Sequence, residues 1–184
     1  MKERGWVLDV YLDRGDAALW IKTDDGRAVK LTDRYEPDFY LELKEGLDLE
    51  TARDRILEHP SIVDALVECK YTSVNNREKS PVLHVRVDSP NNIKRVLRDL
   101  QKISEIRQFF NTDILPVQNY LFKRHFAPTN KVEVEFDDQK RLLSITILDD
   151  EIDIDPPPFT ALVFEVEFQA DTLTPNAAKD PIRR

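Results

Sequence analysis

The feature that most constrains the fold is the order of strand and helix patterns between residues 38 and 110. Two helical repeats of apolar residues alternate with segments rich in strand formers. A capping residue precedes each predicted helix: Asp48 the first, and Ser89, followed by Pro90, the second. The predicted strands are 38–43, 62–71, 82–87 and 106–110. This β-α-β-β-α-β order predicts a ferredoxin-like unit, which many RNA-binding modules share, although a fold of this kind implies no function alone.

Strand and turn patterns flank this unit on both sides. The predicted elements are strands at 6–12, 17–23 and 27–31, a helix at 116–126, a hairpin at 131–136 and 142–148, and a final strand at 161–168. We therefore expect an α+β fold in four parts. These are the N-terminal strands 1–36, the ferredoxin-like subdomain 37–111, a third part at 112–168 and a flexible tail at 169–184. In the third part, the helix, hairpin and final strand are expected to pack back on the N-terminal strands.

Charge and composition limit the functions open to the chain. With 27 Lys+Arg against 35 Asp+Glu, the net charge is −8, so a nucleic acid would have to bind at a local basic patch. No apolar run approaches the roughly 20 residues that span a bilayer, and we expect a cytoplasmic protein with no membrane contact. The single cysteine excludes an internal disulfide. The 4 glycines form no phosphate-binding loop and the 3 histidines have no metal-binding spacing, so no cofactor is expected.

Three stretches carry a resemblance to a known family. Residues 110–121, with sequence FNTDILPVQNYL, are similar to the segment of archaeal-type family B DNA polymerases in which Asp-Ile and proline precede a Tyr-Leu helix. Residues 35–40 resemble the family's proline-containing strand entry, and residues 89–93 resemble its helix start. The resemblance covers about residues 6–168 and implies the fold of the polymerase N-terminal domain, with a role in replication as a template DNA-binding domain or subunit.

The resemblance also implies two kinds of site. In the family, an Asp-x-Glu strand supplies carboxylates to two metal ions for exonuclease chemistry, and the matching residues here are Glu165 and Glu167. The longer glutamate at the first position disturbs this geometry, so we expect a degenerate motif and no catalysis by this chain. Archaeal members bind template uracil in a pocket whose positions fall at Leu12, Pro37, Asp38, Pro90, Ile93, Leu115, Pro116 and Asn119. A slip of one residue would place Tyr11 at the first of these positions.

Two basic clusters are candidates for contact with a nucleic-acid backbone. Lys94, Arg95 and Arg98 lie on the polar side of one predicted helix, and Lys123 and Arg124 end the next. Cations near a helix C-terminus are also expected from the helix dipole alone. The expected partner is single-stranded template DNA, bound weakly, together with the remaining polymerase polypeptide or replication proteins. The alternative is a free-standing, polymerase-like protein that acts as a protein-interaction or regulatory module without uracil sensing.

Overall fold

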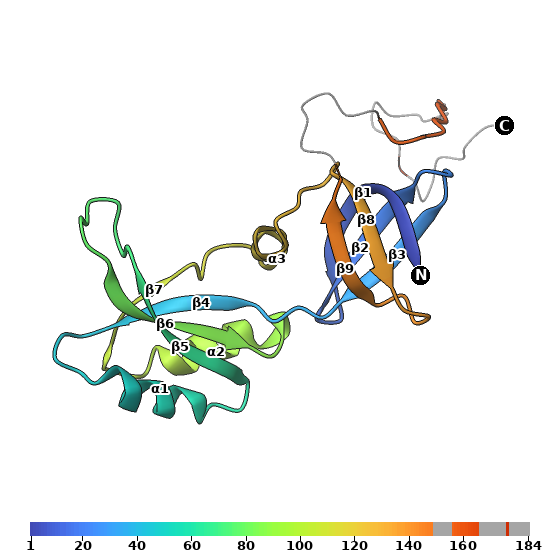
Figure 1. Ribbon diagram of the computed structural model, residues 1–184. Helices are drawn as coiled ribbons and strands as arrows, with labels where there is room; N and C mark the ends of the chain where they lie inside the picture. Colours follow the sequence, from blue (N-terminus) through green and yellow to red (C-terminus); the bar gives the residue numbers. More distant parts are fainter. Residues whose placement is uncertain (149–155, 166–175, 177–184) are drawn as a thin grey trace.

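The structure is a computed structural model that describes residues 1–148, 156–165 and 176. Two β-sheets form two lobes, joined by the segment after β3 and by the helix α3 between them (Figure 1). We call the sheet that contains the N-terminus the first lobe and the other sheet, with its two helices, the second lobe. The structure is thus α+β and built mainly from antiparallel sheets, as the sequence predicts.

The first lobe is a five-stranded antiparallel sheet with strand order β3-β2-β1-β8-β9. Its strands are β1 (Lys2–Asp13), β2 (Asp16–Thr23), β3 (Ala28–Asp33), β8 (Lys131–Phe136) and β9 (Leu142–Ile147). The predicted hairpin thus joins the N-terminal strands. β1 starts earlier than its predicted Trp6, because Lys2–Trp6 pair with β8. Local propensity gives no signal for such a distant partner.

The β1–β2 hairpin shows how local sequence sets this register. Asp13 pairs with Asp16 across a two-residue turn, in which Arg14 and Gly15 both have positive φ, 54° and 100°. This turn type matches the twist of the strands that it joins. Near the other end, Gly5 lies so close to β2 that a Cβ there would be 2.1 Å from the Lys22 carbonyl oxygen. The close strand approach therefore requires glycine at that position.

The second lobe confirms the predicted ferredoxin-like unit. Its elements are β4 (Asp38–Leu43), α1 (Leu49–Leu57), β5 (Ile62–Lys70), β6 (Ser80–Val87), a 3-10 turn (Pro90–Asn92), α2 (Ile93–Leu100) and β7 (Ile106–Phe110). The strand order is β5-β6-β4-β7, and both helices lie on one face of the sheet (Figure 1). Asp48 caps α1 by accepting from the Thr51 amide, as predicted. Alternate strand residues such as Phe39, Leu41, Leu83 and Val85 form the core beneath the helices.

α3 (Pro116–Arg124) lies between the lobes and belongs to the core of the first. Proline occupies its first turn, and the helix ends at His125, which adopts a left-handed backbone with φ 56°. The end falls two residues before the predicted Phe126, because this backbone conformation stops the helical hydrogen bonding. Tyr120 contacts the rings of Tyr35 and Phe126 edge-to-face, at centroid distances of 5.4 and 5.9 Å.

The final strand predicted at 161–168 is not formed in its described part. Residues 161–165 have no regular secondary structure, and Leu162, Val163 and Phe164 are exposed. A strand needs a neighbour for its backbone hydrogen bonds, and within the described ranges no sheet pairs with this segment. The prediction that it packs back on the N-terminal strands is therefore wrong for residues 161–165. Residues 166–168, and all of the predicted tail except Asn176, lie outside the described residues.

Candidate nucleic-acid interface

A buried carboxylate lies at the junction of the two lobes. Asp38, the first residue of β4, exposes only 9% of its side chain. Its Oδ2 accepts a hydrogen bond from Lys123 Nζ at 2.9 Å and lies 2.6 Å from His84 Nε2, while its Oδ1 accepts from Asn119 Nδ2 at 3.1 Å. Asn119 in turn accepts from the Tyr35 hydroxyl at 2.8 Å. We call these five residues the junction network, and it connects β4 and β6 of the second lobe to α3.

The protonation of this network follows from its contacts. Burial by itself would raise the pKa of Asp38, but hydrogen bonds from His84, Lys123 and Asn119 outweigh it and lower the pKa to about 2. The hydrogen bond with Asp38 raises the pKa of His84 above 6.5, against the opposing effect of burial. Glu68, 2.9 Å from His84 Nδ1, adds to this increase. The network therefore holds a carboxylate and favours an imidazolium beside it.

A second buried carboxylate anchors α3 to the first lobe. Asp33, at the end of β3, exposes 7% of its side chain and accepts from the Tyr120 hydroxyl at 2.8 Å. The Arg124 guanidinium also donates to Asp33. Burial of Tyr120 raises the pKa of its phenol, so the hydroxyl stays a donor. The basic end of α3 is thus paired on both sides, with Lys123 on Asp38 and Arg124 on Asp33.

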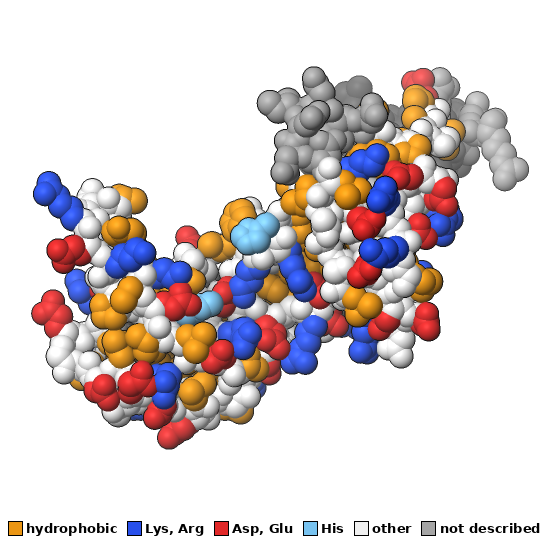
Figure 2. Space-filling model, in the orientation of Figure 1, with side chains coloured by type: hydrophobic (Ala, Val, Ile, Leu, Met, Phe, Trp, Pro, Cys, Tyr) orange, Lys and Arg blue, Asp and Glu red, His pale blue; other side chains and the backbone are white. Residues whose placement is uncertain are grey.

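An open polar groove runs beside these two carboxylates, with a volume of about 510 Å³. We call it the junction groove, and Figure 2 shows basic and acidic side chains gathered between the lobes. Arg34 pairs with Glu36 at 2.9 Å, and Arg86 pairs with Asp64 at 3.0 Å. The groove is lined by Asp33, Arg34, Tyr35, Glu36, Arg86, Tyr120, Lys123 and Arg124. Each of its four cations is paired with a carboxylate, because Lys123 also contacts Asp38 and Arg124 contacts Asp33, so the groove offers positioned cations without a net excess of positive charge.

The uracil-pocket positions implied by the resemblance are distributed over both lobes and α3. Asp38 and Asn119 meet in the junction network, next to Pro37, and Leu115 and Pro116 begin α3. Leu12, by contrast, packs against the core of the first lobe and Ile93 against that of the second. Pro90 is buried in the 3-10 turn, where a Cβ on Gly15 would lie 2.8 Å from Ser89 Oγ. Tyr11, the alternative to Leu12, lies on the opposite face of β1 with Lys30 Nζ 5.3 Å from its ring.

The two predicted basic clusters differ in how far their charges are already satisfied. Lys94 and Arg98 on α2 are exposed and have no partner within the described ranges, and Arg95 donates to Ser61 Oγ at 2.6 Å. Lys123 and Arg124 are held by Asp38 and Asp33. Contact of either cluster with a nucleic-acid backbone stays a prediction. In the structure, Lys123 and Arg124 balance the charges of two buried carboxylates.

Glu165 lies in the exposed segment without strand structure, and Glu167 lies outside the described residues. In the part of the chain that the structure describes, no three or more His, Cys, Asp or Glu side chains gather as a metal-binding group. No helix among the described residues is long and apolar enough to cross a membrane.

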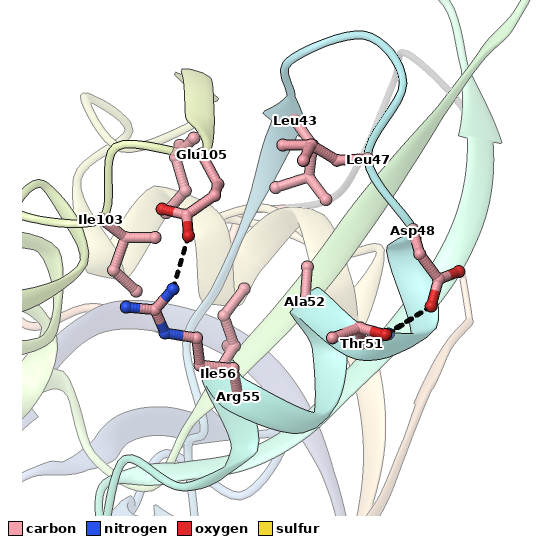
Figure 3. Close-up of a pocket in the computed structure, with 10 residues that line it drawn as sticks. Leu43, Leu47, Asp48, Thr51, Ala52, Arg55, Ile56, Ile103 and Glu105 are labelled. Atoms are coloured by element: carbon pink, nitrogen blue, oxygen red, sulfur yellow. Dashed lines mark hydrogen bonds and ion pairs between the residues drawn. The ribbon is translucent and has the colours of Figure 1, made fainter.

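An apolar cavity of about 190 Å³ lies elsewhere in the second lobe, between α1 and the approach to β7 (Figure 3). Its walls include Leu43, Ile56 and Ile103, and its rim carries the Arg55–Glu105 ion pair at 2.6 Å. Its aliphatic walls offer no stacking surface, and its donors Arg55 and Thr51 are already paired with Glu105 and Asp48. This cavity is therefore a poorer candidate for nucleic-acid contact than the junction groove.

Several junction residues were not identified as site residues from the sequence. His84 could have been noticed because it alternates with Leu83 and Val85 on β6 and so must point away from the core. Asp33 and Tyr35 gave weaker signals. An aspartate at the end of a strand and a tyrosine two residues before a proline are both common in connecting segments. Only the tertiary position of α3 makes them part of a site.

Comparison with known proteins supports the fold. No protein-family model matches the sequence, and no curated protein matches it. Among solved structures, the family B DNA polymerase from the hyperthermophilic archaeon Pyrobaculum calidifontis matches with a TM-score of 0.74 at 18% identity. The match covers 97% of this chain and 24% of that polymerase, so the chain spans about a quarter of its length. The resemblance in fold to an archaeal family B polymerase is therefore confirmed.

Proposed function

We propose that this chain is a template-binding domain of the family B polymerase type, which contacts single-stranded DNA at the junction groove and is not catalytic by itself. The observation that carries the proposal is the polymerase fold over 97% of the chain. The groove adds suitable chemistry, because guanidinium and ammonium groups are the usual donors to phosphate oxygens. Binding, rather than bond cleavage, is what these side chains offer.

The ion pairs of the groove are compatible with phosphate binding. Arg34 and Arg86 expose 75% and 44% of their side chains, and surface ion pairs of this kind contribute only about 0–1 kcal/mol. A phosphate can therefore replace or share the carboxylate partners at little cost. Lys123 and Arg124, by contrast, are fixed by buried carboxylates, so they offer cations whose positions are set before DNA arrives.

The net charge of −8 opposes this binding at long range. We therefore expect weak affinity that falls steeply with salt, since each phosphate contact to a single strand contributes about 0.7 to the salt slope. Lys94 and Arg98 on α2 add two further cations without partners within the described ranges.

Replacing Arg34 by alanine is expected to weaken binding of a single-stranded oligonucleotide about twofold to threefold at ~50 mM salt and to lower the salt slope by about 0.7. Fluorescence anisotropy with a labelled strand measures both quantities. The matched control is Arg27→Ala, which removes an exposed arginine paired with Asp25 and Glu3 outside the groove. Equal losses in both variants would contradict a specific role for the groove.

Strands that contain uracil and strands that contain thymine are expected to bind with affinities within about threefold of each other. The reason is that the side chains of Asp38 and Asn119, at two positions of the implied uracil pocket, are hydrogen-bonded to each other and are not free for a base. Competition anisotropy with otherwise identical strands measures the ratio. A uracil preference above about tenfold, or 1.4 kcal/mol, would contradict this prediction.

A second candidate function is that of a protein-interaction module, which one observation favours. α3 leaves Leu115 and Phe122 64% and 65% exposed on its surface, and apolar side chains of this size are typical of buried interfaces. Here the partner would be the remaining polymerase polypeptide or another replication protein. No detectable DNA binding at ~50 mM salt would exclude the template-binding proposal and leave this function.

A further inference from the structure

The open face of the second lobe carries a cavity that the template-binding proposal does not use. α1 and α2 cover one face of the sheet (Figure 1), so the alternate residues Tyr40, His84 and Phe110 point to the other. A cavity of about 300 Å³ opens there, at the lower end of the range for small-molecule sites, about 300–1,000 Å³. We call it the aromatic pocket, and it is lined by Tyr40, Lys70, Tyr71, Thr72, Val82, Phe110 and Asn111.

Three of its seven lining residues are aromatic. Tyr40 and Phe110 are direct cross-strand partners on β4 and β7. The Tyr40 ring also stacks on His84, with centroids 4.5 Å apart and an interplanar angle of 15°, which fixes its orientation. Tyr71, just after β5, exposes 60% of its surface although it is a large aromatic residue. The sheet thus presents two rings held by strand pairing and one that is open to solvent.

Cations and an amide surround these rings. Lys70 Nζ lies 5.5 Å from the centroid of the Tyr40 ring, and Lys79 Nζ lies 5.6 Å from that of Tyr71. Asn111 is exposed, has a left-handed backbone with φ 62°, and its side chain has no partner among the described residues. The pocket therefore combines a stacking surface, positive charge and a group that can both donate and accept hydrogen bonds.

We propose that the aromatic pocket binds one base of a single-stranded nucleic acid, with Lys70 and Lys79 beside the flanking phosphates. The base stacks on the wall of Tyr40, Tyr71 and Phe110, and the Asn111 amide contacts its edge. Stacking on aromatic side chains with phosphates held by lysines is how single strands are bound without strict sequence preference. The inference rests on the proposed function, since it assigns the same strand a second contact outside the junction groove.

A peptide side chain is the other occupant to weigh. An apolar or aromatic side chain could also pack on these rings, but it would leave the cations and the Asn111 amide without a role. Glu68, which pairs with Lys70 at 2.8 Å, is the acidic residue in direct contact with the pocket's lysine. A phosphate beside Lys70 and Lys79 complements the positive charge better than a neutral side chain does.

The test uses the full chain and three variants. Tyr71→Ala removes the exposed ring, Asn111→Gly removes the amide and keeps the left-handed backbone accessible, and Phe159→Ala is the matched control. Phe159 lies outside the pocket, and its exposed fraction of 64% is similar to the 60% of Tyr71. The probes are a dA oligonucleotide, an abasic strand of equal length, the RNA counterpart and free dAMP, in anisotropy titrations and in chemical-shift titrations of the pocket amides.

The wild-type chain is expected to bind the dA strand at least about fivefold more tightly than the abasic strand. Tyr71→Ala should remove most of that difference without changing the salt slope, because a stacked ring displaces no counterions. Asn111→Gly should weaken binding of the dA strand and leave binding of the abasic strand unchanged, and Phe159→Ala should change neither. Comparable binding of RNA would assign the site to single strands in general, and shifts with dAMP alone would show that a single nucleotide suffices.

Four results would overturn the proposal or separate it from the proposed function. Equal affinity for the dA and abasic strands would overturn the pocket while the junction groove stands. An unchanged affinity in Tyr71→Ala would do the same. Loss of affinity in Tyr71→Ala with no effect of Arg34→Ala would support the pocket and refute the groove, and no binding of any strand would refute both.

Discussion

Replacing Tyr120 by alanine is expected to lower the free energy of unfolding by about 3–5 kcal/mol, the usual cost of truncating a large buried aromatic. Tyr120 is 1% exposed, and it contacts the rings of both Tyr35 and Phe126 edge-to-face. Its hydroxyl also donates to the buried carboxylate of Asp33. Truncation thus opens a cavity in the core of the first lobe and leaves Asp33 with Arg124 as its remaining side-chain partner.

The two contributions can be separated by comparison with Tyr120→Phe. The phenylalanine keeps the ring contacts and loses only the hydrogen bond to Asp33, so a loss of about 1–2 kcal/mol is expected. Urea unfolding followed by far-UV circular dichroism measures both variants. Because α3 packs into the core of the first lobe, we expect the whole unfolding transition to shift to lower urea concentration. Equal losses in the two variants would show that packing of the ring contributes nothing.

Replacing Asp38 by asparagine is expected to lower the free energy of unfolding by about 2 kcal/mol at pH 6. The substitution keeps the shape but removes the charge that accepts from Lys123 and pairs with His84, and hydrogen bonds to charged groups contribute about 1.5–3 kcal/mol. Asp38 is nearly buried, so solvent screens these interactions little. An asparagine oxygen can still accept from Lys123 and His84, which limits the loss, but the asparagine NH2 then faces the Asn119 Nδ2 donor that Asp38 Oδ1 accepts in the wild type.

The pH dependence gives a second, independent measurement for the same variant. The pKa of Asp38 is lowered to about 2, so its contribution is complete above pH ~4 and is lost as the pH falls toward 2. The pKa of His84 is raised above 6.5, so its contribution is complete below that pH and is lost as the pH rises through the raised value. The wild-type chain should therefore be most stable between about pH 4 and 6.5.

In Asp38→Asn, the free energy of unfolding should change less steeply with pH on both the acidic and the alkaline side. The contact of His84 with Glu68 preserves part of the alkaline slope. His84→Gln is the companion variant, because it removes the titrating imidazole and leaves Asp38 paired with Lys123. It should lose the alkaline slope and keep the acidic one. Identical pH profiles for wild type and Asp38→Asn would contradict the assignment of these pKa shifts to the junction network.

The second lobe could be predicted from sequence because its signals are local. The cap at Asp48, the Ser89-Pro90 helix start and the alternation in β4 and β6 each depend on a few neighbouring residues. The predicted final strand failed for the opposite reason: residues 161–164 are a run of apolar residues, but a strand also needs a partner, and its neighbours cannot be read from its own sequence. The same limit made the predicted first strand too short, because the first residues of β1 pair with β8.

The candidate site was harder to predict than the fold. Lys123 and Arg124 were correctly placed at the end of a helix, but their buried partners Asp38 and Asp33 lie more than 80 residues away in the chain. A basic residue looks the same in sequence whether it faces phosphate or a buried carboxylate. The resemblance placed Asp38 and Asn119 at positions of one implied pocket, and only the structure shows that they bond to each other.

The position of the second lobe within the chain has a consequence for how the molecule folds. β1 and β8 are neighbours in the first sheet although the whole ferredoxin-like unit lies between them in sequence. Closing so long a loop costs conformational entropy and slows folding. The unit begins with β4 and ends with β7, and these two strands pair, with Tyr40 opposite Phe110. Once the unit has folded, the pairing of β4 with β7 holds the two ends of the inserted unit side by side. Much of the loop-closure entropy is therefore already lost before β1 meets β8.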